Sequence, residues 1–201
     1  MVRFRLPHRR TTPLLRDTQG AALLEFAITL PLLVVFIVGI YDFSGAFDQK
    51  QKIAQAAQEG AIIAGAQPMS DIQPSGSSSP TNPASLQPVV SAVLNSLTGS
   101  GVLVNGTCAT PTVAGPVGLA WTYSILGCSG ANPNDAVVIT INRGWVAASG
   151  TTGTAVAVGT IVTVQYPYHW RFNSVIQLLI PGANYAATTQ VAESATVHNQ
   201  T

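Results

Sequence analysis

Charged side chains are scarce in this chain: aspartate, glutamate, lysine and arginine make up 8% of its 201 residues, against roughly a quarter in an average soluble domain. Hydrophobic residues make up 47%, which excludes a highly charged disordered chain, because such chains combine low hydrophobicity with high net charge. The formal net charge of +1 excludes a strongly basic nucleic-acid binder. We therefore expect no nucleic-acid partner.

Motifs of catalysis and cofactor binding are also missing. The chain has no phosphate-binding loop, dinucleotide fingerprint, metal-binding helix motif or Gly-x-Ser-x-Gly elbow. The acids and bases from Gln67 onward are few: Asp71, Asp135, Glu193, Arg143, Arg171, His169 and His198. A Ser-His-Asp site built on Asp135 with His169 or His198 has only residue type in its favour. The sequence predicts no enzyme, no cofactor and no small-molecule substrate.

The few charges that are present are unevenly distributed. In the first twenty residues, five arginines and Asp17 sum to +4, and the remainder of the chain sums to −3. Residues 21–41 are apolar apart from Glu25, and as a helix they cover ~31 Å, about the hydrocarbon thickness of a bilayer. The basic flank places the N-terminus in the cytoplasm and the body outside. The sequence predicts a single-pass membrane protein.

Three interpretations of this apolar span compete. The span is a plain anchor, or a secretory signal peptide cut after Ala46, or a segment processed at its start. Ser44-Gly45-Ala46 roughly fits the small-x-small cleavage pattern. The run is longer than the roughly 7 to 15 apolar residues of a signal peptide, and Glu25 inside it disfavours that interpretation.

The third interpretation depends on the sequence Gln19-Gly20-Ala21-Ala22-Leu23-Leu24-Glu25-Phe26. A small residue stands at the membrane edge, an apolar run begins directly after it, and a carboxylate follows five residues later. This resembles the prepilin-peptidase site of type IV pilins and pseudopilins, in which cleavage after Gly leaves Glu at the fifth position. The resemblance implies cleavage between Gly20 and Ala21.

Glu25 carries an energetic cost inside a membrane. A carboxylate costs ~2.5 to 3.5 kcal/mol near the centre of a transmembrane helix and less near the interface, so it usually needs a partner. The resemblance implies that the partner is the new α-amine of Ala21 in a neighbouring subunit, a pair that sets the axial register of the helices. The alternative is that Glu25 merely reaches the lipid headgroups.

After the membrane, a helix is expected to continue outward to about residue 66. Apolar residues recur there at three- and four-residue steps, with one seven-residue gap: Phe43, Phe47, Ala54, Ala57, Ala61 and Ala64. The pattern predicts a stripe that faces the protein core, with a contact between subunits as the alternative.

Three segments together carry a narrower resemblance. They are Arg16-Asp17-Thr18-Gln19-Gly20-Ala21-Ala22-Leu23-Leu24-Glu25-Phe26-Ala27, Leu30-Pro31-Leu32-Leu33 and Ala56-Ala57-Gln58-Glu59-Gly60-Ala61. This N-terminal region is similar to that of TadE-like and TadG-like proteins, minor pilin-like components of tight-adherence (Flp-type) pilus systems. Gln58 departs from the family, which often has Arg there.

The resemblance implies a location and partners. The protein would sit in the cytoplasmic (inner) membrane of a bacterium, with its N-terminus in the cytoplasm and its C-terminal domain extracytoplasmic. Its partners would be a prepilin peptidase, other pilin-like subunits and the pilus assembly platform. It would either enter the surface pilus, a cell-adhesion structure, or remain in the membrane. The alternative is an anchored extracytoplasmic binding module without a pilus role.

The pattern of the chain predicts five consecutive regions. They are a basic leader (1–20), the span (21–41), the helix continuation (42–66), a flexible Pro/Ser-rich linker (67–87) and an exported β-rich domain (88–201). In the last region we expect a short helix at 88–97, strands at 101–104, 119–126, 136–142, 155–166 and 188–197, and one or two helical turns within 173–180. The expected fold class is α+β, with a small antiparallel sheet laid against the outer half of the long helix.

Two further features belong to the exported domain. Cys108 and Cys128 are the only cysteines; outside the cytoplasm such a pair favours a disulfide, worth ~3 kcal/mol if unstrained. No metal site is expected, because two thiols need further ligands and the three histidines are scattered. The aromatic cluster 166–172 has two interpretations: a strand end packed on the helix, or a ligand platform or membrane-interface belt.

Overall fold

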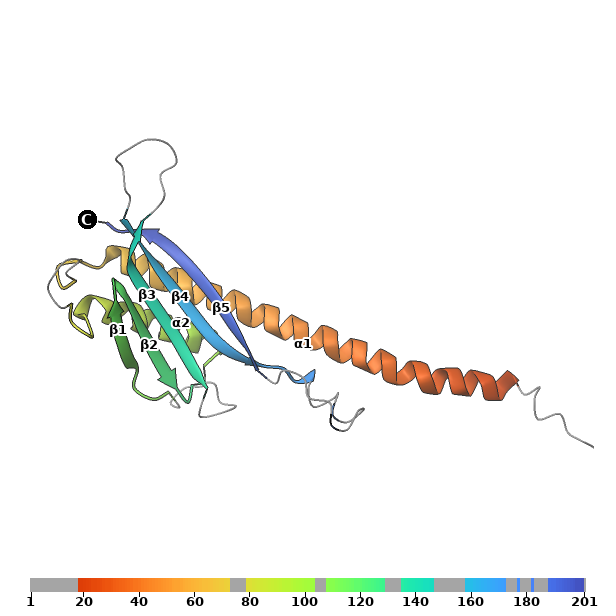
Figure 1. The fold of residues 1–201 in the computed structure, drawn as a ribbon. Helices are drawn as coiled ribbons and strands as arrows, with labels where there is room; N and C mark the ends of the chain where they lie inside the picture. The colour runs from red at the N-terminus through yellow and green to blue at the C-terminus, as the bar shows by residue number, and fades with distance from the viewer. Residues whose placement is uncertain are drawn as a thin grey trace, which may run out of the picture.

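The fold is described from a computed structural model for residues 18–72, 79–103, 108–128, 135–146, 158–172, 177, 182 and 188–200. A long helix α1 (Thr18–Ala66) is followed by a 3₁₀ turn η1 (Ala84–Leu86) and a helix α2 (Gln87–Gly99). Five strands follow: β1 (Thr112–Val117), β2 (Ala120–Leu126), β3 (Ala136–Val146), β4 (Val158–His169) and β5 (Thr188–His198). Figure 1 shows the sheet gathered around one half of α1, while the other half extends away alone.

Helix α1 is divided into a free half and a packed half. Its 49 residues span ~74 Å at ~1.5 Å per residue. From Gly20 to Tyr41 no residue is buried, and the first buried residue is Asp42. Pro31 lies inside the helix, where its missing N–H removes one backbone hydrogen bond, which membrane helices tolerate.

The five strands form an antiparallel meander in the order β1-β2-β3-β4-β5. Successive side chains point to opposite faces of a strand, and one face of this sheet is buried under α1 and α2. One inward row across the sheet pairs Trp121 with Ile141, Ile141 with Val162, and Val162 with Ala195. The predicted α+β class, with an antiparallel sheet on the outer half of the long helix, is confirmed.

The predicted core stripe of α1 is right in its later part and wrong in its earlier part. Ala57, Ala61 and Ala64 are buried, but Phe43 and Phe47 are 61% and 62% exposed. The buried face instead follows Asp42, Ile53, Ala56 and Gly60, which lie about a third of a turn around the helix from the two phenylalanines at ~100° per residue. Small residues define this face because α2 and the sheet approach the α1 backbone closely there.

The described parts of the connection between α1 and α2 are packed, whereas the sequence predicted a flexible linker over 67–87. In its described parts, residues 67–72 and 79–87, the buried side chains are Ile72, Pro83, Ser85 and Leu86. Trp121 donates its indole N–H to the Pro80 carbonyl (3.1 Å), and the Ser85 N–H donates to Asp71 (2.8 Å). Proline lacks a donor but keeps its carbonyl, so a proline-rich segment still bonds to the core.

Most predicted elements of the exported domain are confirmed, and two are wrong. Helix α2 and strands β2 to β5 lie close to their predicted positions. Residues 101–103 are not a strand: Val102 and Leu103 bend back and both donate to the Leu97 carbonyl at the end of α2. Strand β1 was missed, because Gly115 and Pro116 inside it are typical of a turn. Of the predicted helical segment 173–180, only Gln177 lies among the described residues.

The C-terminus of α1 is closed by a buried arginine from β3. Arg143 is fully buried and donates to the carbonyls of Ala64 (2.6 Å) and Gln67 (2.8 Å), with its Nε 3.0 Å from the Met69 sulfur. Burial lowers the pKa of this guanidinium from its ordinary value, while the charge of Asp71 opposes that shift. Since the last carbonyls of a helix lack intrahelical partners and carry partial negative charge, a cation there satisfies both needs.

Gly60 makes the close approach of α1, α2 and β4 possible, and this leads to a first prediction. A Cβ at Gly60 would lie 2.5 Å from Val93 and 3.3 Å from Val162. Gly60→Val is therefore expected to lower the free energy of unfolding by about 2 kcal/mol through overpacking, measured by urea unfolding of the detergent-solubilised chain. Gly99→Val is the matched control, since a Cβ at Gly99 meets nothing within 4 Å. Equal destabilisation by the two variants would contradict this account of the core.

Candidate functional site

The predicted processing site lies at the free end of α1. Gly20 and Ala21 are exposed residues in the first turn of the helix, which begins at Thr18. The first four N–H groups of a helix have no intrahelical partner, so this turn unwinds at less cost than the helix interior. The Gly20–Ala21 bond is thus placed where a protease can extend the chain without disturbing the packed half of α1.

Glu25 lies one helical turn beyond Ala21 on the same free half. It is exposed, and within the described part of the chain it has no hydrogen-bond or ion-pair partner. In a helix the Cα–Cβ bonds tilt toward the N-terminus, so the Glu25 carboxylate leans back toward the level of Ala21. If this half of α1 is in lipid, the residues that the structure describes supply no partner for this charge.

The free half of α1 exposes a continuous apolar surface. The helix from Gly20 to Ala66 is long and apolar enough to cross a membrane, by length and composition. Its exposed large side chains include Leu23, Leu24, Phe26, Ile28, Leu30, Leu32, Leu33, Val34, Phe36, Ile37 and Ile40. Apolar surface of this extent, on a stretch of helix with no buried residue in the part of the chain that the structure describes, marks a contact with lipid or with other apolar helices.

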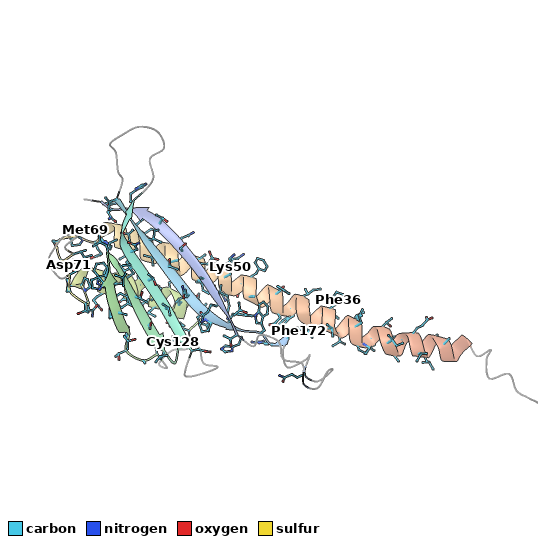
Figure 2. The ribbon with its side chains drawn as sticks, in the orientation of Figure 1. Phe36, Lys50, Met69, Asp71, Cys128 and Phe172 are labelled. Atoms are coloured by element: carbon cyan, nitrogen blue, oxygen red, sulfur yellow. A yellow bond between two sulfur atoms is a disulfide. The ribbon has the colours of Figure 1, made fainter. Side chains whose placement is uncertain are left out.

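A groove lies where the free half of α1 meets the sheet. It has a volume of about 800 Å³ and is lined by Val35, Phe36, Gly39, Ile40, Phe43, Ser44, Phe47, Asp48, Gln51 and Phe172. Figure 2 shows Phe172 beside α1, between the sheet and the free half of the helix. A Cβ built at Gly39 meets nothing within 4 Å. The two phenylalanines wrongly expected in the core, Phe43 and Phe47, line this groove.

Asp42 fastens α1 to the end of β4 at the boundary between the two halves. Its side chain is 2% exposed. One carboxylate oxygen accepts the Phe172 N–H at 2.8 Å, and the Tyr168 hydroxyl lies 3.2 Å from the other oxygen and 3.0 Å from the Asp42 carbonyl. Burial, followed by the Asp42 charge, raises the pKa of Tyr168 to about 12. The tyrosine therefore remains a neutral donor across the physiological pH range.

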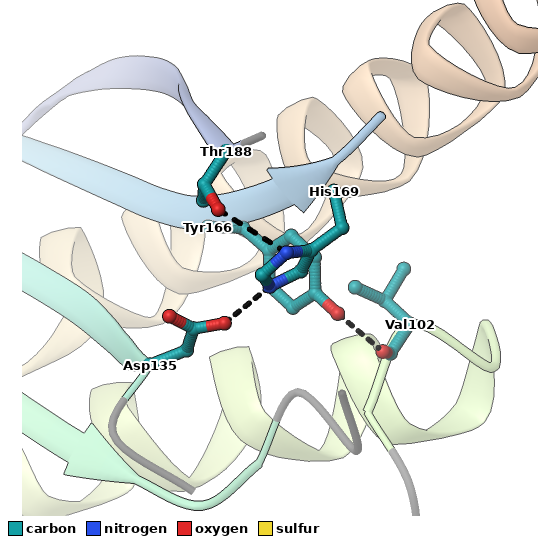
Figure 3. A network of polar contacts seen from close by, with 5 residues as sticks. All are labelled: Val102, Asp135, Tyr166, His169 and Thr188. Carbon is teal, nitrogen blue, oxygen red and sulfur yellow. Dashed lines mark hydrogen bonds and ion pairs between the residues drawn. The ribbon is translucent and has the colours of Figure 1, made fainter. Parts of the chain in front are cut away.

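A second polar network closes the same end of the sheet (Figure 3). His169 on β4 contacts Asp135 through Nε2 and lies 3.2 Å from the Thr188 hydroxyl through Nδ1. Tyr166 donates to the Val102 carbonyl after α2 at 3.3 Å. Asp135 and His169, considered above for a catalytic site, are thus brought together. Thr188, the third residue of this network, is the cross-strand partner of His169 in the β4–β5 ladder, so the network joins the ends of strands.

The aromatic cluster at the end of β4 packs on α1. Trp170 makes edge-to-face contacts with Phe43 (ring centroids 5.4 Å apart) and with Tyr168 (5.0 Å). The indole N–H of Trp170 donates to the Thr189 hydroxyl at 2.7 Å. The first interpretation of the cluster, a strand end packed on the helix, describes Tyr168 and Trp170.

The two cysteines are joined as predicted. Cys108 and Cys128 form a disulfide with their Cα atoms 4.4 Å apart, and it closes a loop of 20 residues in sequence. The Ala109 N–H donates to the Leu126 carbonyl beside it (2.9 Å), so the bridge fixes the segment before β1 to the end of β2. Among the described residues there is no group of three or more His, Cys, Asp or Glu side chains suited to a metal ion.

The sequence predicted the cysteine pair, which is confirmed, and roles for Gly20, Ala21 and Glu25, which stay predictions, but it gave no role to Asp42 or Arg143. A signal existed for Asp42, because it is the first charge after the apolar span. For Arg143 the sequence offers one weak indication of a role: it is one of two arginines in an exported domain with very few charges.

These features define a class: an α+β protein with one N-terminal helix suited to single-pass membrane anchoring. Residues 20–61 match the family model described as TadE-like protein. The match begins at Gly20 and covers the free half of α1 and most of its packed half, so the predicted resemblance is confirmed over this segment. It suggests a component associated with a Tad pilus. No curated protein and no solved structure matches the chain.

Proposed function

We propose that this protein is a pilin-like, membrane-anchored component that serves the assembly of a tight-adherence (Flp-type) pilus. It spans the bacterial inner membrane once, with the N-terminus in the cytoplasm and the sheet domain outside. The observation that carries the proposal is the TadE-like match over residues 20–61 on a helix whose apolar half has no buried residue within the described part of the chain. Assembly through contacts between helices requires an exposed apolar helix, and here the sheet domain packs only on the later half of α1, so the earlier half stays exposed.

The first step of the proposed mechanism is processing between Gly20 and Ala21 by a prepilin peptidase. The peptidase is expected to unwind the weakly bonded first turn of α1 and to remove the basic leader, residues 1–20. Two charges then lie one helical turn apart in apolar surroundings: the new α-amine of Ala21 and the carboxylate of Glu25. Each lowers the cost of burying the other if helices of adjacent subunits bring them together.

The second step is lateral packing of the processed helix with other pilin-like helices and with the assembly platform. The groove between Phe36, Phe43 and Phe172 lies beside Gly39, whose lack of a side chain allows a neighbouring helix to approach closely. Pairing of Ala21 with Glu25 of a neighbour then sets the axial register, while the dispersed apolar contacts supply affinity. In this step the sheet domain, which is packed on the later half of α1, moves together with that helix.

The alternative function, an anchored extracytoplasmic binding module, treats α1 as a tether only. Replacing residues 21–41 with an unrelated apolar span of equal length, with the leader kept, separates the two functions. We expect the chimera to insert into the membrane but to lose pilus assembly, scored by pili sheared from cells that lack the native copy. The matched control is the same chimera with Glu25 restored at its position, which is expected to recover part of the assembly. Full assembly by the first chimera would favour the tether.

A further inference from the structure

Four aromatic side chains surround the point where α1 leaves its free half. Tyr41 and Phe43 come from α1, and Trp170 and Phe172 come from the end of β4; we call them the aromatic collar. Tyr41 is 66% exposed and Phe43 is 61% exposed, while Trp170 and Phe172 are half-buried. Arg171, between the latter two, is exposed. The collar is therefore a partly open surface, although some of its rings touch one another.

The collar is held at one level along α1. The Phe172 N–H donates to the Asp42 carboxylate, and the Trp170 ring packs on Phe43, so these two residues, which follow β4, are fixed beside the residues that follow the apolar span. Phe172 also lines the groove with Val35 and Phe36, which lie about two helical turns back inside the span. If residues 21–41 are in the bilayer, the end of β4 has to reach its surface.

We propose that the segment Trp170-Arg171-Phe172, with Tyr41 and Phe43, inserts into the interfacial layer of the lipid bilayer and seats the sheet domain directly on the membrane. The inference rests on the proposed single-pass anchoring of α1. Tryptophan and tyrosine favour the boundary between headgroups and acyl chains because one part of each ring system is apolar and another is polar. Phe172 then faces the acyl chains, and Arg171 contacts the lipid phosphates.

A bilayer fits this surface better than a protein partner. The collar lies at the end of the apolar span and combines phenylalanine with tryptophan, tyrosine and the exposed Arg171, the residue types that are favoured at a membrane interface. The polar side of Trp170 is already satisfied by Thr189, so shallow insertion leaves no indole donor unpaired. Contact of the collar with the bilayer surface would also hold α1 in one orientation about its axis, so that the groove faces a fixed direction in the membrane.

Depth-dependent quenching of tryptophan fluorescence tests the insertion. The full chain is reconstituted into phosphatidylglycerol and phosphatidylcholine vesicles whose acyl chains are brominated either near the headgroup or near the chain end. In Trp121→Phe/Trp145→Phe, with Trp170 as the reporter, bromine near the headgroup is expected to reduce the emission about twofold, and bromine near the chain end much less.

Trp121 supplies the matched control. It is fully buried, and its row of the sheet reaches Val162 beside Gly60, 18 positions and thus ~27 Å along α1 from Asp42. A variant that keeps only Trp121 is expected to be unquenched by either lipid. If loss of Trp121 prevents folding, the difference in quenching between the wild-type chain and Trp170→Phe reports the same depth with the core intact.

A third reporter separates failure of this inference from failure of the anchor. Phe36→Trp, in a chain whose own tryptophans are replaced by phenylalanine, is expected to be quenched most by bromine near the chain end. Quenching of this reporter with no lipid quenching of Trp170 overturns the seating proposal and leaves the anchor intact, which would point to a protein partner at the collar. Absence of quenching at both positions overturns the membrane span, and the proposed function with it.

Discussion

Replacing Glu25 with alanine is expected to leave the protein in the membrane while reducing its incorporation into pilus assemblies by at least about tenfold. Insertion survives because alanine makes the span more apolar. Incorporation fails because the Ala21 amine of a neighbour loses its counter-ion in a medium of low dielectric; breaking a buried ion pair by removing one partner costs ~3 to 5 kcal/mol, and ~1.4 kcal/mol is already tenfold. Carbonate extraction scores insertion, and quantitative blotting of sheared pili and of cross-linked membrane complexes scores incorporation.

Two further variants make this result specific. Glu25→Gln keeps the shape and removes the charge, so it should behave like alanine if pairing with an amine matters. Glu59→Ala removes an exposed carboxylate from the packed half of the same helix, where it accepts a hydrogen bond from Gln55 (3.3 Å), and it should incorporate normally. Normal piliation by Glu25→Ala, or an equal loss with Glu59→Ala, would contradict the register mechanism.

Replacing Arg143 with alanine is expected to lower the free energy of unfolding by about 3 kcal/mol, because each buried acceptor left without a donor costs ~1 to 3 kcal/mol. The Gln67 carbonyl, bonded at 2.8 Å, would lose its arginine donor, and the Ala64 carbonyl, bonded at 2.6 Å, would keep only the longer bond from the Gln67 N–H at 3.2 Å. The cavity left in a fully buried site adds to the loss. Urea unfolding of the detergent-solubilised chain, followed by circular dichroism, measures the change.

Arg143→Lys and Arg171→Ala provide the comparison. Lysine keeps the charge but lacks the planar fork that reaches two carbonyls at once, so it should recover only part of the lost stability. Arg171 is exposed, and its removal should change the free energy of unfolding by no more than about 0.5 kcal/mol. If the Arg143→Ala variant unfolds at the same urea concentration as the wild-type chain, the stability of the protein does not depend on the hydrogen bonds from Arg143 to the end of α1.

The features predicted correctly from the sequence are those that local chemistry determines. The length of the apolar run, the charges at its ends and the position of Glu25 are read from consecutive residues, and β-type segments separated by Gly, Asn and Pro predicted four of the five strands. The match at residues 20–61 lies in the same segment. Local patterns were sufficient there because a membrane span requires one continuous apolar run, and strands are apolar runs bounded by turn residues.

The features that were missed depend on contacts between distant segments. Arg143 meets Ala64 across 79 positions of sequence, and Asp42 meets Phe172 across 130. The orientation of α1 was mispredicted because large apolar side chains were assumed to face the core, whereas Gly60 and its alanine neighbours allow α2 and β4 to approach. Phe43 and Phe47 are accordingly available for the groove and the aromatic collar.

The N-terminal residue of the mature protein tests the central proposal most directly. Protein purified from native membranes is digested, and its N-terminal peptide is identified by mass spectrometry, alongside protein from cells lacking the prepilin peptidase and the Gly20→Leu variant. The account predicts chains that begin at Ala21 in the wild type and chains that retain the leader in both controls. Wild-type chains that retain the whole leader, or that begin at Phe47 after cleavage behind Ala46, would contradict it.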